Sequence, residues 1–305
     1  MDYLGEIAGI ATSISWTLCS LGFALAGRRI GAVAVNQIRI FIAVAILFAV
    51  HAATQGSLWP SVSTDQLGWL ALSGLLGLAI GDSFYFHSIS VLGPRIGSVL
   101  MATAPVMCAL LAWPVLGERL SGTGWLGMGL TILGVVLVVV DPRGEPTWEG
   151  DGPRGSRGFA VVAGLLGALG QASGLVFSKL GMAADEAHAA LEPLPATVVR
   201  MAAGAAGVLL LALWGGQLRR TVSAVRDGRA MSATMFGVLF GPTLGVWMSM
   251  VAVKHADAGV AATLMALPPV FMIPVARVAY GARSGRRAIA GTLLAVAGTA
   301  VLFLR

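Results

Sequence analysis

Ten apolar stretches of membrane-spanning length account for most of this chain. A helix needs about 20 apolar residues to cross the hydrocarbon core of a bilayer. Only 11% of the 305 residues are charged and 57% are hydrophobic, whereas a soluble domain carries about 25% charged residues. The sequence therefore predicts an all-α integral membrane protein with ten transmembrane helices. The expected spans are 4–26, 32–52, 67–90, 95–116, 122–140, 158–181, 195–215, 233–254, 258–280 and 287–304.

The second half of the chain repeats the first at a constant offset of 164 residues. The matching pairs include Leu100-Met101-Ala102 with Leu264-Met265-Ala266, Pro105 with Pro269, Gly77 with Gly241, Gly81 with Gly245, Gly127 with Gly291 and Gly134 with Gly298. The longest polar break, 142–157, separates five spans in 1–141 from five in 158–305. Because an odd number of spans reverses the second half, we expect two inverted five-helix repeats around a polar linker, a common transporter design.

The basic residues are distributed unevenly over the loops. Loops after odd-numbered spans carry 13 arginines, and the other loops with both termini carry Arg119, Lys254 and Arg305. The positive-inside rule then places the odd loops in the cytoplasm and both termini outside. The net charge of +6 is explained by this orientation signal, and no basic-aromatic stripe indicates a nucleic acid partner. The thirteen are Arg28, Arg29, Arg95, Arg143, Arg154, Arg157, Arg219, Arg220, Arg226, Arg229, Arg283, Arg286 and Arg287.

The end of the fourth span and the whole fifth span carry a recognisable pattern. Pro105 is followed by Leu116-Gly117-Glu118-Arg119 and then by a glycine-rich helix from Gly127 to Val139. This pattern resembles the drug/metabolite transporter superfamily, and within it the EamA-type transporters. The resemblance covers nearly the whole chain, and it implies a transporter that exports an amino acid or a related small metabolite. Arg39 and Arg200 also look like the family's arginine in the second helix of each half.

The chain departs from that family in two respects. Ala282 stands where the second copy of the motif usually has Glu, so a symmetric role for Glu118 is not available. Members of the family are also commonly drawn with cytoplasmic termini, which is opposite to the orientation that the arginine count predicts.

Asp82 and Arg39 are the deepest ionisable residues of the expected spans. They lie roughly 15 Å and 12 Å from helix ends on the same side, so a buried ion pair between them is geometrically possible. Such a pair either fixes helix packing only or makes Asp82 a proton-accepting or substrate-binding group. His87 could join a proton relay, although an interfacial position suits it better. Lys179, Arg277 and Arg200 lie closer to helix ends and are interpreted as interfacial anchors.

Polar and aromatic residues near mid-span are the candidates for a substrate cavity. Each one alone is more often interhelical glue than a ligand contact. Pro105 and Pro269 lie at equivalent positions inside spans, where a proline permits a kink and a gating role. The expected cavity residues are Trp16, Gln37, Asp82, Tyr85, Gln171, Ser173 and Trp247, on helices around the implied central axis.

These features favour a secondary transporter of the cell membrane that works by alternating access, with the bilayer, a small-molecule substrate and protons as partners. The alternatives are a proton-coupled drug exporter, a metabolite importer of the same fold, or an intramembrane enzyme or lipid-handling protein with a lateral groove around Asp82 and His87. No phosphate-binding loop, metal-ligand cluster or activated nucleophile occurs in the sequence. We therefore expect no catalytic residue, cofactor or metal, and the sequence leaves the substrate, the coupling ion and the oligomeric state open.

Overall fold

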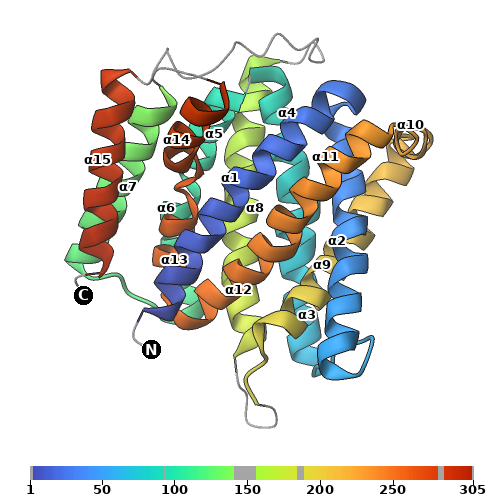
Figure 1. The fold of residues 1–305 in the computed structure, drawn as a ribbon. Helices are drawn as coiled ribbons and strands as arrows, with labels where there is room; N and C mark the ends of the chain where they lie inside the picture. Colours follow the sequence, from blue (N-terminus) through green and yellow to red (C-terminus); the bar gives the residue numbers. More distant parts are fainter. Residues whose placement is uncertain (1–2, 93, 141–155, 184–188, 281–284, 304–305) are drawn as a thin grey trace.

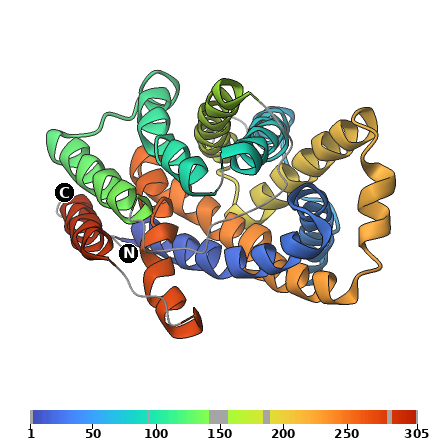
Figure 2. The same ribbon diagram turned by 90° about the horizontal axis from the view of Figure 1, so that it is seen from above.

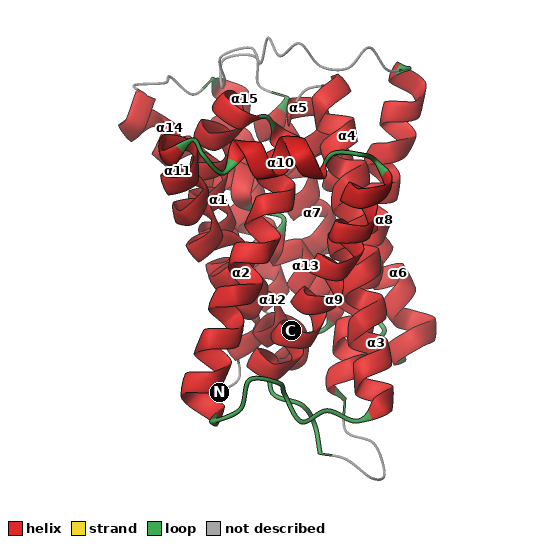
Figure 3. Ribbon diagram, turned by 90° about the vertical axis from the view of Figure 1, so that its right-hand side faces the viewer, coloured by secondary structure: helices red, strands yellow, loops and turns green. Residues whose placement is uncertain are grey.

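The computed structural model describes residues 3–92, 94–140, 156–183, 189–280 and 285–303, and every regular element in these ranges is a helix (Figures 1 and 3). Ten stretches are long and apolar enough to cross a membrane, which confirms the expected spans. The elements are α1 Leu4–Ile30, α2 Ala32–Gln55, α3 Thr64–Gly74, η1 Leu75–Gly81, α4 Asp82–Leu92, α5 Pro94–Met101, α6 Ala104–Leu116, α7 Gly122–Val139, α8 Arg157–Met182, α9 Pro193–Trp214, α10 Leu218–Ala224, α11 Gly228–Val238, η2 Leu239–Gly245, α12 Val246–His255, α13 Ala258–Met265, α14 Pro268–Tyr280 and α15 Arg286–Phe303.

Helix ends follow local sequence signals. Ser63 and Gln66 form a capping box at the start of α3, and Ser121 caps α7 through the backbone N–H of Gly124 at 3.1 Å. The first expected span ends at residue 26, but α1 continues through Arg28 and Arg29 to Ile30. The chain turns instead at Gly31, whose φ of 85° is accessible to glycine at little cost.

The two halves run through the bundle in opposite directions. The chain's ends, marked N and C, lie at the same end of the bundle, and α8 begins at the opposite end from α1 (Figure 1). The contacts between halves are also matched. α1 packs against α11, η2 and α12, and α8 packs against α3, η1 and α4. These are the contacts that an inverted repeat requires, although the symmetry itself stays a prediction.

Helix breaks and π-helical segments interrupt the spans at equivalent positions of the two halves. The fourth span is divided into α5 and α6, and the ninth into α13 and α14. The third and eighth spans each contain a seven-residue π-helical segment, η1 and η2, and the two segments are 164 residues apart. π-Helical segments are rare and occur frequently at functional sites. Pro105 and Pro269 do not kink a continuous helix as expected. Each proline lies in the first turn of a new helix, where its missing N–H is tolerated.

The fifth and tenth spans, α7 and α15, form a separate pair at one edge of the bundle (Figure 2). Their backbones touch through repeat-related glycines. A Cβ added at Gly134 would lie 2.5 Å from the Gly291 carbonyl oxygen, and one at Gly127 would lie 3.0 Å from that of Gly298. Small residues at such crossings allow close helix packing in a membrane.

Candidate functional site

A charge cluster of Arg39, Asp82 and Arg200, called the central charge cluster below, joins the two halves. Arg39 on α2 donates from Nη2 to the Asp82 carboxylate on α4, and from Nε to Asn36 Oδ1 at 2.9 Å. The Arg39 guanidinium also lies over the rings of Phe23 and Phe86, with 5.6 and 5.2 Å to the centroids. The structure therefore brings together the ion pair that the sequence allowed. Its role in coupling stays a prediction.

Arg200 on α9 is the third member, and no carboxylate among the described residues is in direct contact with it. Arg200 is 2% exposed, and its guanidinium is attracted to the Asp82 carboxylate over a longer distance. Nη1 lies 3.8 Å from Met250 Sδ, and Nε has no hydrogen-bond partner in the described part of the chain. Burial of a charge without a close partner is unfavourable in a membrane protein and indicates a functional site.

Arg200 lies beside a close crossing of η1 and α8, which touch at two glycine pairs. A Cβ at Gly77 would lie 3.4 Å from Gly174 Cα and 3.1 Å from Arg200 Nη2. One turn along, a Cβ at Gly81 would lie 3.2 Å from Gly170 Cα. η1 and α8 thus meet backbone to backbone, and the guanidinium lies beside their crossing. The interpretation of Arg200 as an interfacial anchor is wrong, because its side chain turns inward.

Several of the expected cavity residues lie around this cluster or at the matching crossing. Gln171 on α8 and Arg200 both approach Gly77, and Gln171 Oε1 has no hydrogen-bond partner within the described ranges. Tyr85 packs on Gly167 of α8. Trp16 contacts Gly245 on the η2 side, and Trp247 packs on the buried cluster that includes Leu78 and Val246.

Gln37 and Ser173 are engaged elsewhere. Gln37 donates to Gln217 Oε1 at 2.8 Å and accepts a hydrogen bond from Thr221 on α10. Ser173 donates to the Leu169 carbonyl of its own helix at 2.7 Å. None of these three hydrogen bonds reaches the central charge cluster, and a place for Gln37 and Ser173 in a substrate cavity stays a prediction. The side chain of Arg277 and the motif residues 281–283 lie outside the described residues.

A second ion pair ties four spans together at the end of the bundle where the termini lie. Glu118, just after α6, lies 2.5 Å from Lys179 Nζ on α8 and accepts a hydrogen bond from the backbone N–H of Ala258 on α13 at 2.7 Å. Lys179 also donates to the carbonyl of Ala256, which follows α12. Lys179 is therefore a cross-link between helices and not an interfacial anchor. The next motif residue, Arg119, lies over Trp113 at 5.5 Å.

Glu118→Gln is expected to lower the free energy of unfolding by about 1.5–3 kcal/mol, because it weakens a charge-assisted hydrogen-bond pair. Glu192→Gln is the matched control. Glu192 pairs with Lys254 at 2.9 Å but its side chain is 72% exposed, so a loss of under about 1 kcal/mol is expected. Thermal unfolding in detergent measures both. Equal losses in the two variants would contradict a special role for the Glu118 pair.

His87 lies in a lateral groove, as the lipid-handling alternative requires, but Asp82 does not. The groove has a volume of about 350 Å³ and is lined by Ile80, Ser83, Phe84, His87, Phe159 and Leu211. His87 contacts the Phe159 ring, with 5.3 Å between centroids. Among the described residues no group of three His, Cys, Asp or Glu side chains could hold a metal ion. The groove therefore lacks the reactive carboxylate that the alternative needs.

Comparisons with known proteins agree with this architecture. The model of the EamA-like transporter family matches twice, over residues 3–140 and 158–304. The putative permease-like protein YdzE of Bacillus subtilis is 31% identical over 24% of this chain and 92% of its own length. The quaternary ammonium compound-resistance protein QacE of Escherichia coli is 30% identical over 25% of this chain and 72% of its own.

Other similarities are more partial or concern the fold alone. Protein LicB of Haemophilus influenzae is 33% identical over 30% of this chain, which spans one third of its length (33%). A solved crystal structure superposes with a TM-score of 0.76, covering 100% of this chain and 97% of its own at 17% identity, and this likeness shows the fold. With both halves matched by one family model and ten apolar spans present, the chain is a multi-pass membrane protein and belongs to the EamA-like transporter family of the drug/metabolite transporter superfamily.

Proposed function

We propose that this protein is a secondary transporter of the cell membrane that exports an amino acid or a related small metabolite by alternating access. The observation that carries the proposal is the central charge cluster. It draws Arg39 and Asp82 from the first half and Arg200 from the second. Arg39 and Arg200 lie about 10 Å from the starts of α2 and α9, and Asp82 lies about 15 Å from the end of α4. Ionisable groups so far inside a membrane commonly belong to a transport or proton pathway.

The balance of charge in the cluster supports a substrate with a carboxylate. Two guanidinium groups and one carboxylate leave one net positive charge. Gln171 Oε1 and Arg200 Nε add an acceptor and a donor that have no hydrogen-bond partners among the residues that the structure describes. An amino acid carries groups that match both. QacE is named for resistance to quaternary ammonium compounds, and a permanently cationic substrate fits a positive cluster poorly.

The divided spans support alternating access. The pairs α5/α6 and α13/α14 lie at equivalent positions of the two halves, and broken helices near the middle of a membrane commonly flank transport sites. Glu118 and Lys179 join helices of both halves at the end of the bundle where α1 begins, so this ion pair is a candidate for the contact that opens and closes on that side.

Asp82→Asn is expected to remove the dependence of transport on a proton gradient, because the amide cannot gain and lose a proton. The measurement is uptake of labelled amino acids and metabolites into liposomes, with and without an imposed pH difference. Asp65→Asn is the matched control, since Asp65 lies exposed in the first turn of α3, the same span, and should leave transport unchanged.

Two results distinguish the parts of this proposal. Normal transport by Asp82→Asn at every pH would exclude proton coupling through this carboxylate. A wild-type protein that moves quaternary ammonium compounds but no amino acid would overturn the substrate class and favour the drug exporter.

A further inference from the structure

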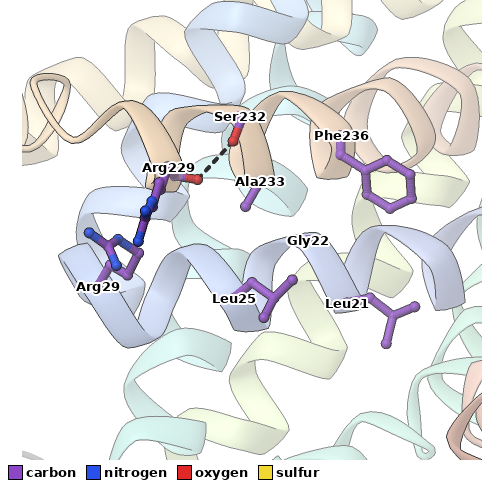
Figure 4. Close-up of a pocket in the computed structure, with 8 residues that line it drawn as sticks. All are labelled: Leu21, Gly22, Leu25, Arg29, Arg229, Ser232, Ala233 and Phe236. Atoms are coloured by element: carbon purple, nitrogen blue, oxygen red, sulfur yellow. Dashed lines mark hydrogen bonds between the residues drawn. The ribbon is translucent and has the colours of Figure 1, made fainter. Parts of the chain in front are cut away.

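A groove runs between α1 and α11 on the outer face of the bundle (Figure 4). Its volume is about 600 Å³, within the range of small-molecule sites. It is separate from the central charge cluster and shares no residue with it. The lining residues are Leu21, Gly22, Leu25, Arg29, Arg229, Ser232, Ala233 and Phe236.

The floor and far end of the groove are apolar and exposed to the membrane. Leu25 is 53% and Phe236 42% exposed, on helices that are membrane spans. From Arg29 to Leu21 the groove follows α1 for about 12 Å, less than half of a hydrocarbon core of about 30 Å. The helices cross closely at Gly22, where an added Cβ would lie 2.6 Å from the Ala233 carbonyl oxygen. This tight crossing leaves a shallow channel along the helices.

The other end of the groove is positively charged. Arg29 and Arg229 both line the groove there (Figure 4). Arg29 Nε donates to Asp227 at 2.9 Å, whereas Arg229 has no ion pair among the described residues. The backbone N–H of Ala230 and the Arg29 side chain hold the pKa of Asp227 below its ordinary value. The carboxylate therefore stays ionised, and the two arginines with it keep one net positive charge.

We propose that this groove binds an anionic phospholipid, with its phosphate on Arg29 and Arg229 and part of an acyl chain along Leu21, Leu25 and Phe236. The arginines lie where α1 ends and α11 begins, at the level of the lipid headgroups. The apolar channel continues from them toward the membrane interior. A basic end joined to an apolar channel between transmembrane helices matches an anionic lipid in both charge and shape.

The arrangement favours a lipid over a small soluble anion. A free phosphate would use the arginines but would leave the apolar channel without an occupant. A zwitterionic lipid would fill the channel but would bring a second positive charge to the two guanidinium groups. Ser232 adds a hydroxyl at the same end, and its Oγ donates to the Arg229 carbonyl at 3.0 Å.

Binding can be measured on the full-length protein in detergent by native mass spectrometry, titrating dioleoyl phosphatidylglycerol against dioleoyl phosphatidylcholine. The wild type is expected to retain the anionic lipid preferentially. Arg229→Ala should weaken its binding about fivefold, the effect of one basic residue near a membrane surface. Ala233→Phe should also weaken it by filling the channel, although both arginines remain.

Arg226→Ala is the matched control, because Arg226 is exposed near the same helix end but does not line the groove. It should change lipid binding less than twofold. The proposal is overturned if Arg226→Ala weakens binding as much as Arg229→Ala, or if both lipids bind equally. Displacement of the lipid by millimolar inorganic phosphate would also overturn it, since it would assign the arginines to a small anion. Folding of each variant is checked by its melting temperature.

Discussion

Replacing Arg200 by Met is expected to stabilise the protein while transport is lost. Arg200 is 2% exposed, and among the described residues its Nε has no hydrogen-bond partner and no carboxylate is in direct contact with it. Methionine has a similar length, and its flexible side chain can pack against Met250, whose Sδ is contacted by Arg200. Replacement of buried charges by apolar groups of similar volume is often neutral or stabilising, by about 1–4 kcal/mol. A residue that reduces stability where it stands is typical of a functional site.

Arg39→Met should have the opposite effect on stability. Arg39 is in direct contact with Asp82, so its removal leaves a carboxylate inside the membrane without its close partner. Breaking a buried pair in this way costs about 3–5 kcal/mol. The two arginines belong to one cluster and receive the same substitution. The predicted change in unfolding free energy is nevertheless positive for Arg200→Met and negative for Arg39→Met. This contrast separates a structural arginine from one that serves the substrate.

Unfolding in detergent measures the change in stability, and uptake into liposomes measures the transport rate. Both are measured on the same protein preparations. The expected pattern for Arg200→Met is a higher unfolding free energy with at least tenfold slower uptake. A destabilised Arg200→Met that still transports at the wild-type rate would show that the guanidinium only holds helices together.

The sequence predicted the spans and the Arg39–Asp82 contact because both depend on distance along a helix. Apolar length sets the span ends, and depth arithmetic places two opposite charges at one level. Arg200 shows where this reasoning stops. Its distance from a helix end allowed an interfacial position, but the rotation of α9 turns its side chain toward Gly77 and Gly174. Helix rotation depends on neighbouring helices, which one sequence does not specify.

The partners of Gln37 were also beyond the sequence. Gln37 is hydrogen-bonded to Gln217 just before α10 and to Thr221 in α10. α10 has only seven residues, too few for the apolar length that identifies a span. The segments η1 and η2 were not expected either, since a π-helical segment changes the hydrogen-bond register without a strong residue preference. The available signal was the repeated glycine pair, because Gly77 and Gly81 lie in η1 and their repeat mates Gly241 and Gly245 lie in η2.

Gly134→Leu is expected to reduce the unfolding free energy by about 3 kcal/mol or more. A Cβ at this position would lie 2.4 Å from the Ala295 backbone nitrogen and 2.5 Å from the Gly291 carbonyl oxygen. Both atoms belong to the backbone of α15, so no side-chain rotation relieves the clash, and α7 and α15 must move apart. Overpacking by added carbon atoms alone costs about 1–3 kcal/mol where side chains can adjust, and here they cannot.

Gly129→Leu on the same helix is the matched control. Nothing lies within 4 Å of a Cβ at Gly129, and loss of a mid-helix glycine favours the helix by roughly 0.5–1 kcal/mol. Gly298→Leu extends the test to the second half, because Gly298 is the repeat mate of Gly134 and its Cβ would lie 2.4 Å from the Thr131 backbone nitrogen. If the halves are related by an inverted repeat, Gly134→Leu and Gly298→Leu should destabilise the protein to a similar degree. A large loss at one glycine and none at the other, measured by unfolding in detergent, would show that the pairing of α7 with α15 is not symmetric.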